Sequence, residues 1–252
     1  MNIVITGASS GFGKAIAEKF AAEGHHLWLT ARRADRLKTL QETLTGKYAV
    51  EVHIDALDVR DQKAVAHWAE TLRSSCNRVD VLVNNAGLAL GLSTIDEGAI
   101  EDWDQMIDTN VKGLLYVSRA LMPYFKQQKS GHIINIGSTA GKSVYPMGNV
   151  YCATKFAVDA LSQAMRIDLL PYHIKVTSVN PGMAETEFSI VRFKGDTERA
   201  AAAYKGIKVL SAVDIADTVY YCATLPPHVC INDLTITCTQ QANGNYKLLD
   251  QE

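Results

Sequence analysis

Thr6-Gly7-Ala8-Ser9-Ser10-Gly11-Phe12-Gly13 is the stretch that decides the fold. The apolar residues just before it predict a strand, and residues 14–23 after it carry apolar side chains at helical spacing. Its glycines follow the spacing G-x-x-x-G-x-G, a variant of the pattern in which backbone amides at a helix N-terminus bind a pyrophosphate. A glycine turn between a strand and a helix therefore predicts a dinucleotide site, and a simple helix-capping turn is the alternative.

Strands and helices alternate along the rest of the chain. We expect further strands near 26–31, 50–54, 79–83, 132–136, 175–179 and 234–237, and helices near 35–44, 62–74, 107–128, 151–170 and 213–225. Near-continuous apolar strands in such an order are typical of a doubly wound α/β protein, whose parallel sheet has helices on both faces. No linker or repeat divides residues 1–252, so we expect a single domain. Residues 181–212 interrupt the alternation, and an insertion of this length is typical of a substrate loop.

Composition excludes several classes of protein. The chain has 252 residues, 47% hydrophobic and 21% charged, and its formal charge of -2 argues against nucleic acid as a partner. No apolar run approaches the roughly 20 residues that a membrane span requires, and no basic leader precedes the first strand. The five cysteines form no C-x-x-C pair and show no metal-ligand spacing with the seven histidines. We expect free thiols, no metal and a cytoplasmic protein.

Two arginines follow the second predicted strand. In dinucleotide-binding folds, a carboxylate about 20 residues after the glycine turn binds the adenosine ribose, whereas a basic residue accepts a 2'-phosphate. Arg32 and Arg33 occupy that place, so the sequence predicts NADP as cofactor, and two solvated loop arginines are the alternative. Asp58 and Val59, after the third strand, are candidates for the adenine edge, although Asp58 fits a capping or solvated residue equally well.

The fourth predicted strand ends in small and amide side chains. Asn84 is followed by Asn85, Ala86 and Gly87, where the backbone is able to approach a ligand at the carboxyl ends of the strands. We therefore include these three residues in the predicted cofactor site.

Tyr151 and Lys155 are four residues apart in a predicted helix, so their side chains project from one face. A tyrosine has an ordinary pKa of about 10, and a neighbouring ammonium favours its phenolate. Ser138 follows the strand at 132–136, where its hydroxyl is placed to hold an oxygen of the substrate, and Asn110 is placed to hold a water near Lys155. Singly, each is more often a core tyrosine, surface lysine, capping serine or buried amide. Together they predict proton transfer.

The chain resembles the short-chain dehydrogenase/reductase family over nearly its whole length. The stretches that carry the resemblance are Thr6 to Gly13, Asn84 to Gly87, Asn110, Ser138, Tyr151 to Lys155, and Pro181-Gly182. It implies a Rossmann-like fold of about seven parallel strands, with Pro181, Gly182 and Thr186 added to the cofactor site. It also implies a water-relay role for Asn110, an oxygen-orienting role for Ser138, acid/base chemistry for Tyr151, and ribose binding with phenolate stabilisation for Lys155.

Within that family, the chain most resembles NADP-dependent 3-hydroxy acid dehydrogenases, a group that includes serine 3-dehydrogenase and malonic semialdehyde reductase. Residues 84–91, 134–141 and 186–196 carry this closer resemblance. It implies reversible hydride transfer between NADP and a short 3-hydroxy acid, in a homotetramer. Arg192 is the candidate partner of the substrate carboxylate, with a solvated arginine as the alternative. A carbonyl reductase of diketones, ketoesters or aldehydes and a nucleotide-binding regulator without turnover are the other interpretations.

Three residues depart from the family pattern. Cys152 and Phe156 replace an expected glycine and alanine beside the Tyr-Lys pair, and Met147 stands where a glycine often precedes Gly148. We expect these to narrow or reshape the pocket. Cys152 has no general base at a useful spacing, so an inert thiol is the better interpretation. The tail after Gln240 also departs from the family, and we expect it to affect assembly more than chemistry.

Overall fold

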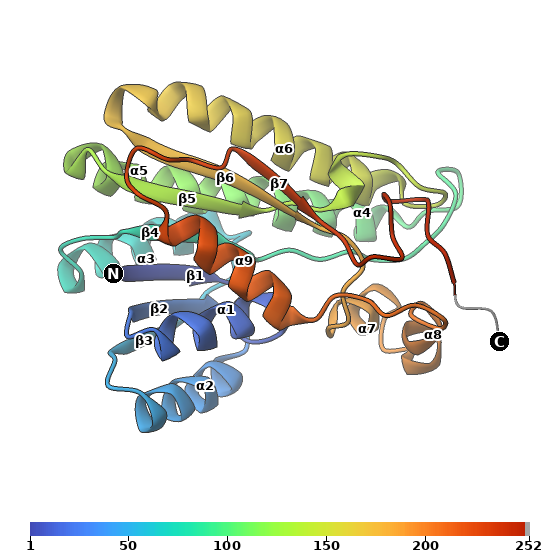
Figure 1. Ribbon diagram of the computed structural model, residues 1–252, viewed down its shortest axis with the longest axis horizontal. Helices are drawn as coiled ribbons and strands as arrows, with labels where there is room; N and C mark the ends of the chain where they lie inside the picture. Colours follow the sequence, from blue (N-terminus) through green and yellow to red (C-terminus); the bar gives the residue numbers. More distant parts are fainter. Residues whose placement is uncertain (250–252) are drawn as a thin grey trace.

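Seven parallel strands form one sheet in the computed structural model, which describes residues 1–249. The strands lie in the order β3-β2-β1-β4-β5-β6-β7, so the direction of progression reverses between β1 and β4 (Figure 1). In open α/β sheets, ligands bind outside the carboxyl ends of the strands at such a reversal. The strands are β1 (Asn2–Thr6), β2 (His26–Ala31), β3 (Val52–Ala56), β4 (Val81–Asn84), β5 (Gly131–Ile136), β6 (Ile174–Pro181) and β7 (Asp233–Ile236).

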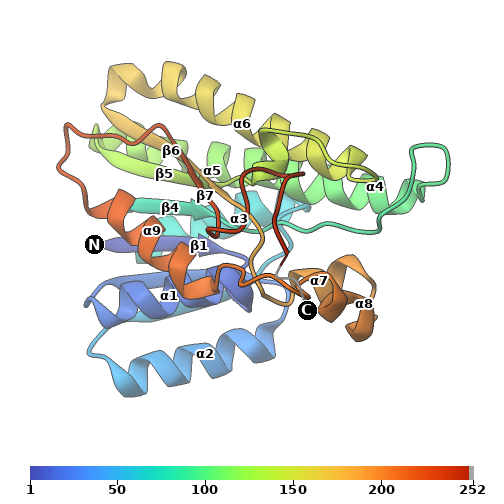
Figure 2. The ribbon, with the colours of Figure 1, turned by 45° about the vertical axis from the view of Figure 1, so that its right-hand side comes forward.

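Helices cover both faces of the sheet. Helices α1, α2 and α9 lie on one face, and α3, α5 and α6 on the other (Figures 1 and 2). This arrangement confirms the predicted doubly wound α/β class and the count of about seven strands. The helices are α1 (Gly11–Ala22), α2 (Ala34–Lys47), α3 (Gln62–Ser75), α4 (Ile100–Ile107), η1 (Asp108–Gly113), α5 (Leu114–Gln128), η2 (Thr139–Gly141), α6 (Asn149–Leu169), η3 (Leu170–Tyr172), α7 (Phe188–Arg192), α8 (Thr197–Ala202) and α9 (Ala212–Thr224).

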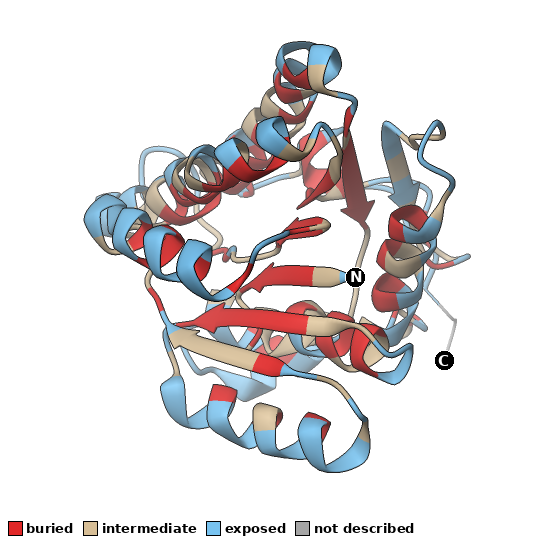
Figure 3. Cartoon of the chain, turned by 90° about the vertical axis from the view of Figure 1, so that its left-hand side faces the viewer, coloured by how far each residue is buried: buried red, intermediate tan, exposed pale blue. Residues whose placement is uncertain are grey.

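The central strands are apolar on both sides because both sides are covered. In β1, Ile3 and Ile5 pack with α1 and α9, whereas Val4 between them packs with the helices of the opposite face. This is the two-residue period of a strand, with each face buried in its own core. Figure 3 shows the result, with buried positions on the strands and on the inner sides of the helices.

The helix that we expected to begin at residue 107 begins earlier. Helix α4 starts at Ile100 and passes into α5 through η1, a π-helical turn. Glu101 and Asp102 stand in its first turn, where carboxylates favour a helix N-terminus. Ile100, Trp103, Met106 and Ile107 stand at helical spacing in α4, so the apolar pattern is present there and the prediction began the helix too late. Strand β3 likewise begins two residues later than expected, at Val52.

Residues 182–211, between β6 and α9, form the predicted insertion. They contain α7 and α8, which lie beyond the carboxyl ends of the strands (Figure 2). The chain after β7 returns to the same end of the molecule, where Gly244 N donates to Ser143 Oγ and Gln241 Oε1 accepts from Met183 N. Two segments therefore cover the end of the sheet where a ligand is expected.

None of the helices within residues 1–249 is long and apolar enough to cross a membrane. Over the same residues, no group of three His, Cys, Asp or Glu side chains is placed to hold a metal ion. All five cysteines are free.

Candidate active site

A cavity of about 560 Å³ opens at the carboxyl ends of the strands. It is lined by almost all of the predicted site residues: Gly7, Ser9, Ser10, Gly11, Phe12, Arg32, Arg33, Asp58, Val59, Asn85, Ala86, Gly87, Ser138, Tyr151, Lys155, Pro181, Gly182, Thr186 and Arg192. Gly13 and Asn110 do not line it and lie behind it. Segments that are far apart in the sequence are thus brought to one place.

The glycine turn needs its glycines for two reasons. Gly7 and Gly11 have φ angles of +67° and +53°, a left-handed conformation that side chains disfavour. Gly13 allows close packing, because a Cβ there would lie 2.5 Å from both Asn85 Nδ2 and Gly7 O. Ser10 precedes α1 without making a side-chain cap, so the first amides of the helix remain available to an anion.

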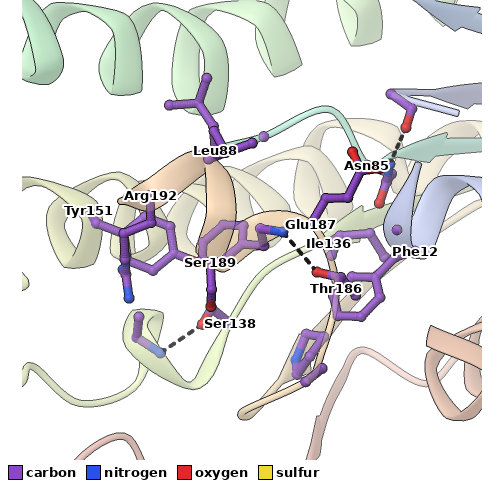
Figure 4. Close-up of a pocket in the computed structure, with 18 of the residues that line it drawn as sticks. Phe12, Asn85, Leu88, Ile136, Ser138, Tyr151, Thr186, Glu187, Ser189 and Arg192 are labelled. Carbon is purple, nitrogen blue, oxygen red and sulfur yellow. Dashed lines mark hydrogen bonds between the residues drawn. The ribbon is translucent and has the colours of Figure 1, made fainter. Parts of the chain in front are cut away.

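Hydrogen bonds tie the end of β4 to this turn. Thr6 Oγ1 accepts from the backbone N of Asn85 and of Ala86, both at 3.0 Å. Asn85 Nδ2 in turn donates to Thr6 O at 2.9 Å and to Gly7 O at 3.2 Å (Figure 4). The amide side chain predicted for the cofactor site therefore fixes the shape of the turn.

One end of the cavity, which we call the Arg33 end, consists of Ser9, Ser10, Arg33, Arg36 and Glu187. Arg33 donates to Ser9 Oγ, to Ser10 Oγ at 2.6 Å and to Glu187 Oε2 at 3.1 Å. Arg36 Nη1 lies 2.7 Å from Glu187 Oε1. Burial alone would raise the pKa of the Glu187 carboxyl, but the hydrogen bonds and charges of Arg36 and Arg33 bring it below its ordinary value.

Arg32 and Asp58, the other predicted residues near this end, differ in their hydrogen-bond partners. Arg32 is exposed and forms no ion pair within 4 Å among residues 1–249, although its charge adds to the larger effect of Arg60 in lowering the pKa of Asp58. The Asp58 carboxylate is held by Arg60, at 2.6 Å from Nη2, and this hydrogen bond lowers its pKa. Asp58 is thus neither a free carboxylate nor a helix cap, and its contact with adenine remains a prediction.

The opposite end, which we call the Tyr151 end, contains Tyr145, Tyr151, Lys155 and Arg192. Tyr151 and Lys155 project from α6 and are 8% and 7% exposed. Burial raises the pKa of Tyr151 above its ordinary value, opposed by the Arg192 charge and the Ser138 hydroxyl. Burial also lowers the pKa of Lys155 to about 8. Lys155 Nζ donates to Ile136 O at 2.9 Å and lies 5.9 Å from the centre of the Tyr151 ring.

Ser138 and Asn110 are held by backbone contacts. Ser138 Oγ accepts from Ala140 N at 3.1 Å, so its hydrogen remains available as a donor (Figure 4). Asn110 lies in η1, where its side chain both accepts from Leu88 N and donates to Leu88 O, each at 2.8 Å. A Cβ on Gly87 would lie 3.2 Å from Asn110 Oδ1 and 3.7 Å from Lys155 Nζ, so amide and ammonium flank the same glycine.

Arg192 lies beside Tyr151 in the cavity (Figure 4). Its guanidinium carbon is 4.9 Å from the centre of the Tyr151 ring and 5.3 Å from that of Phe188. Its Nη2 donates to Tyr145 Oη at 2.6 Å, while its Nε–H is buried without a hydrogen-bond partner among residues 1–249. Arg192 is therefore surrounded by neutral groups, and a solvated arginine is the wrong interpretation.

Several lining residues were not among the predicted site residues. They are Tyr145, Glu187 and Phe188, together with Gln241, Gly244 and Lys247 of the C-terminal chain. The tail that we expected to affect assembly thus contributes to the cavity wall. The sequence of this tail contains no recognised motif, and long-range hydrogen bonds, such as those to Ser143 and Met183, bring it to the cavity.

The three departures from the family pattern do not line this cavity. Cys152 is fully buried in a cluster with Leu88 and Met106, and burial raises the pKa of its thiol, as expected of an inert cysteine. Phe156 is 42% exposed on α6. Met147 lines a small neighbouring pocket and has a positive φ of 61°. None of the three lines the main cavity, so they do not narrow it directly, but Cys152 packs in one cluster with Tyr151 and Leu88, which do line it.

Comparison with known proteins places the chain in a family. Residues 1–196 match the family described as short chain dehydrogenase. The chain is 44% identical over 243 residues to NADP-dependent 3-hydroxy acid dehydrogenase YdfG of Salmonella typhi, covering 96% of both chains. It is 47% identical over 241 residues to a sulfoacetaldehyde reductase of Chromohalobacter salexigens, covering 95% of this chain and 94% of the relative.

A solved structure gives the same result. The closed form of serine dehydrogenase complexed with NADP+ superposes with a TM-score of 0.92 at 41% identity, covering 100% of both chains. The resemblance inferred from the glycine turn, Ser138 and the Tyr-Lys pair is therefore confirmed. This chain belongs to the short-chain dehydrogenase family.

Proposed function

We propose that this protein is an NADP-dependent dehydrogenase that interconverts a short 3-hydroxy acid and its 3-oxo acid. The observation that carries the proposal is the position of Arg192, a cation with a buried, unpartnered Nε–H, 4.9 Å from the ring of Tyr151. A half-buried guanidinium with an unpartnered N–H favours an anionic ligand, and Tyr151 is the predicted proton carrier. A substrate with an acid group and a hydroxyl a few bonds apart would satisfy both.

The residues present fit a dinucleotide. The turn at Gly7 and Gly11 has the backbone that a phosphate cradle needs, and the start of α1 is free of a side-chain cap. Arg32 and Arg33 supply guanidinium groups for a 2'-phosphate. When bound, the nicotinamide supplies the hydride chemistry, while the protein supplies orientation and proton transfer.

Tyr151 gives its hydroxyl proton to the substrate oxygen in reduction and accepts it in oxidation. Because burial raises its pKa, the free protein holds Tyr151 as the phenol. Ser138, whose hydrogen is available, orients the same oxygen. Lys155 binds the ribose and supplies positive charge to the phenolate, and Asn110 relays protons through water beside it. Proton transfer of this kind contributes about 10² to 10⁴ in rate.

The cofactor assignment is tested by replacing Arg32 and Arg33 together with alanine. Loss of both guanidinium groups should raise the Kd of NADP about 10- to 100-fold, in line with charge-assisted hydrogen bonds, and leave the Kd of NAD unchanged. Titration calorimetry measures both constants. An unchanged ratio of the two would remove the arginines from the 2'-phosphate site.

The substrate assignment is tested with Arg192→Met and a 3-hydroxy acid paired with its methyl ester. We expect kcat/KM for the acid to fall about 100-fold and that for the ester to change by less than about threefold, since only the acid loses a charged partner. Arg199→Met is the matched control, because Arg199 also stacks on an aromatic ring, Phe193, but does not line the cavity. If Arg192→Met kept its preference for acids, a neutral substrate would become the better proposal.

A sulfonate is the second candidate for the acid group. The similarity to a sulfoacetaldehyde reductase favours it, and a guanidinium binds sulfonate as well as carboxylate. A substrate panel with NADPH that contains matched carboxylate and sulfonate aldehydes separates the two. Reduction of diketones, ketoesters or neutral aldehydes is less consistent with a half-buried guanidinium, and a regulator without turnover is less consistent with the complete set of Ser138, Tyr151 and Lys155.

We also propose a homotetramer in the cytoplasm. Support for assembly comes from exposed apolar side chains on two helices of one face of the sheet, Leu115 on α5 and Phe156 and Ile167 on α6. Free cysteines suit a reducing compartment. Light scattering of the purified protein measures the number of subunits.

A further inference from the structure

Glu187 is held by two arginines at the place where a 2'-phosphate is expected. Arg33 Nη1 lies 3.1 Å from Glu187 Oε2, and Arg36 Nη1 lies 2.7 Å and 2.9 Å from the two carboxylate oxygens. Arg33 also donates hydrogen bonds from Nε and Nη2 to the hydroxyls of Ser9 and Ser10. An internal carboxylate therefore accepts hydrogen bonds from two arginines beside the end of β2 and the glycine turn.

A carboxylate and a phosphate compete for the same guanidinium fork. Three of the Arg33 nitrogens already donate, and Glu187 is the anion among their acceptors. Arg33 and Glu187 are each 40% exposed, and a pair this exposed changes an equilibrium constant by a factor of about five at most. The contact is weak enough for an incoming phosphate to replace it.

Glu187 also connects the Arg33 end to the Tyr151 end. It directly precedes α7, and α7 carries Phe188 and Arg192. The Phe188 ring is 5.7 Å from that of Tyr151, and the guanidinium carbon of Arg192 is 4.9 Å from it. The Glu187 carboxylate therefore lies at the start of the short helix whose side chains surround Tyr151.

We propose that Glu187 is an internal stand-in for the 2'-phosphate, displaced from Arg33 when NADP binds, and that its release repositions α7 beside Tyr151. Arg36, which makes the shorter contacts, keeps the carboxylate as Arg33 turns to the phosphate. A cofactor without the phosphate leaves the Arg33–Glu187 pair intact. Glu187 is thus a specificity-determining residue that couples cofactor choice to the substrate side of the cavity. The proposal rests on the assignment of Arg33 to the 2'-phosphate.

The first test is calorimetric titration of the cofactor-free protein with adenosine 2',5'-bisphosphate and with 5'-AMP. Glu187→Gln removes the competing charge, so it should bind the bisphosphate about two- to fivefold more tightly and bind AMP as the parent does. Glu185→Gln is the matched control, because it removes an exposed carboxylate two residues away and should leave both constants unchanged. Equal or weaker binding of the bisphosphate by Glu187→Gln would overturn the proposal.

The second test follows hydrogen exchange of the α7 amides. In the parent protein, the bisphosphate should speed exchange of residues 187–193 several-fold and AMP should not, whereas in Glu187→Gln neither ligand should change it. The same response to both ligands in the parent protein would overturn the coupling.

Arg33→Ala separates this proposal from the cofactor assignment. If Arg33→Ala binds the bisphosphate as tightly as the parent, Arg33 does not bind the phosphate and the assignment itself fails. If Arg33→Ala loses the bisphosphate while Glu187→Gln binds it as the parent does, the assignment stands and only the role of Glu187 is wrong.

Discussion

The charged side chains at the two ends of the cavity differ in their exposure and in their partners. At the Arg33 end, Arg33, Arg36 and Glu187 are each about 40% exposed and paired with an opposite charge. At the Tyr151 end, Lys155 is 7% exposed and bonds a backbone carbonyl, and Arg192 touches rings and a hydroxyl. Charges in water exchange partners at small cost, whereas buried charges shift their pKa toward the neutral form. The Arg33 end is therefore built to exchange one anion for another, and the Tyr151 end to receive one.

Tyr151→Phe gives the largest expected loss of activity, because it removes the hydroxyl that carries the proton at the Tyr151 end. The ring volume stays the same while the proton carrier is lost, so kcat should fall about a thousandfold, within the range of general acid–base catalysis. Steady-state kinetics with NADPH measures this fall. The Kd of NADPH should change by less than about twofold, since the Arg33 end is untouched.

Tyr145→Phe is the control for that variant. It removes the hydroxyl that accepts from Arg192 but leaves Tyr151 in place. We expect KM for the acid substrate to rise while kcat stays within about threefold, because the change affects the position of the anion partner rather than the proton carrier. Full activity of Tyr151→Phe would show that the proton comes from another group.

Lys155→Met tests how much the buried Lys155 ammonium lowers the free energy of unfolding. Burial lowers the Lys155 pKa from 10.5 to about 8, so below pH 8 the folded protein carries a charge that it disfavours. Between pH 8 and 10.5 the unfolded chain binds more protons than the folded one, so the penalty disappears as pH rises through that window. At pH 7, Lys155→Met should gain up to about 3 kcal/mol in the free energy of unfolding. Urea unfolding at pH 7, 9 and 10.5 measures the gain.

Lys175→Met is the comparison for this prediction. Burial also lowers the pKa of Lys175, which is less buried and donates to Leu225 O, so its gain should be smaller. A gain from Lys155→Met that stayed constant from pH 7 to 10.5 would mean that packing rather than charge causes it. The comparison between the two ends would then lose its electrostatic basis.

The sequence predicts those parts of the fold in which local pattern and tertiary structure agree. Strand β2 has the expected bounds, His26–Ala31, because its apolar run lies between a helix stop at Gly24 and the two arginines. Helix α6 was expected from Tyr151 and begins two residues earlier, at Asn149. The start of α4 was missed although Ile100, Trp103 and Met106 stand at helical spacing, so a local signal was present there and was overlooked.

The contacts that distinguish the two ends of the cavity could not be predicted in this way. Arg33 and Glu187 are 154 positions apart, and only the close approach of α7 to the glycine turn makes them partners. The sequence identified Arg33 after β2, but no motif indicated that the Glu187 carboxylate is its partner. Arg192 was a candidate from its loop, yet its burial against Tyr145 and Tyr151 depends on a segment packed from elsewhere in the chain. Local patterns identify residue types, whereas the partners of those residues are set by tertiary packing.

The last and smallest difference concerns which residues adopt the left-handed backbone conformation near the two ends of the cavity. The turn near the Arg33 end places glycines at its positive φ angles of 67° and 53°, whereas the loop between Tyr145 and Gly148 places Met147 at 61°. A residue with a Cβ destabilises the folded protein by about 1–2 kcal/mol in this conformation. Glycine removes this strain, but it also raises the conformational entropy of the unfolded chain, which offsets part of the stabilisation. Met147→Gly should therefore raise the free energy of unfolding by about 0.5–1 kcal/mol. Met147→Ala keeps the Cβ and should give no gain in the same urea titration. If both variants stabilised the protein equally, removal of the half-exposed methionine side chain would be the cause, and the two ends would not differ in backbone strain.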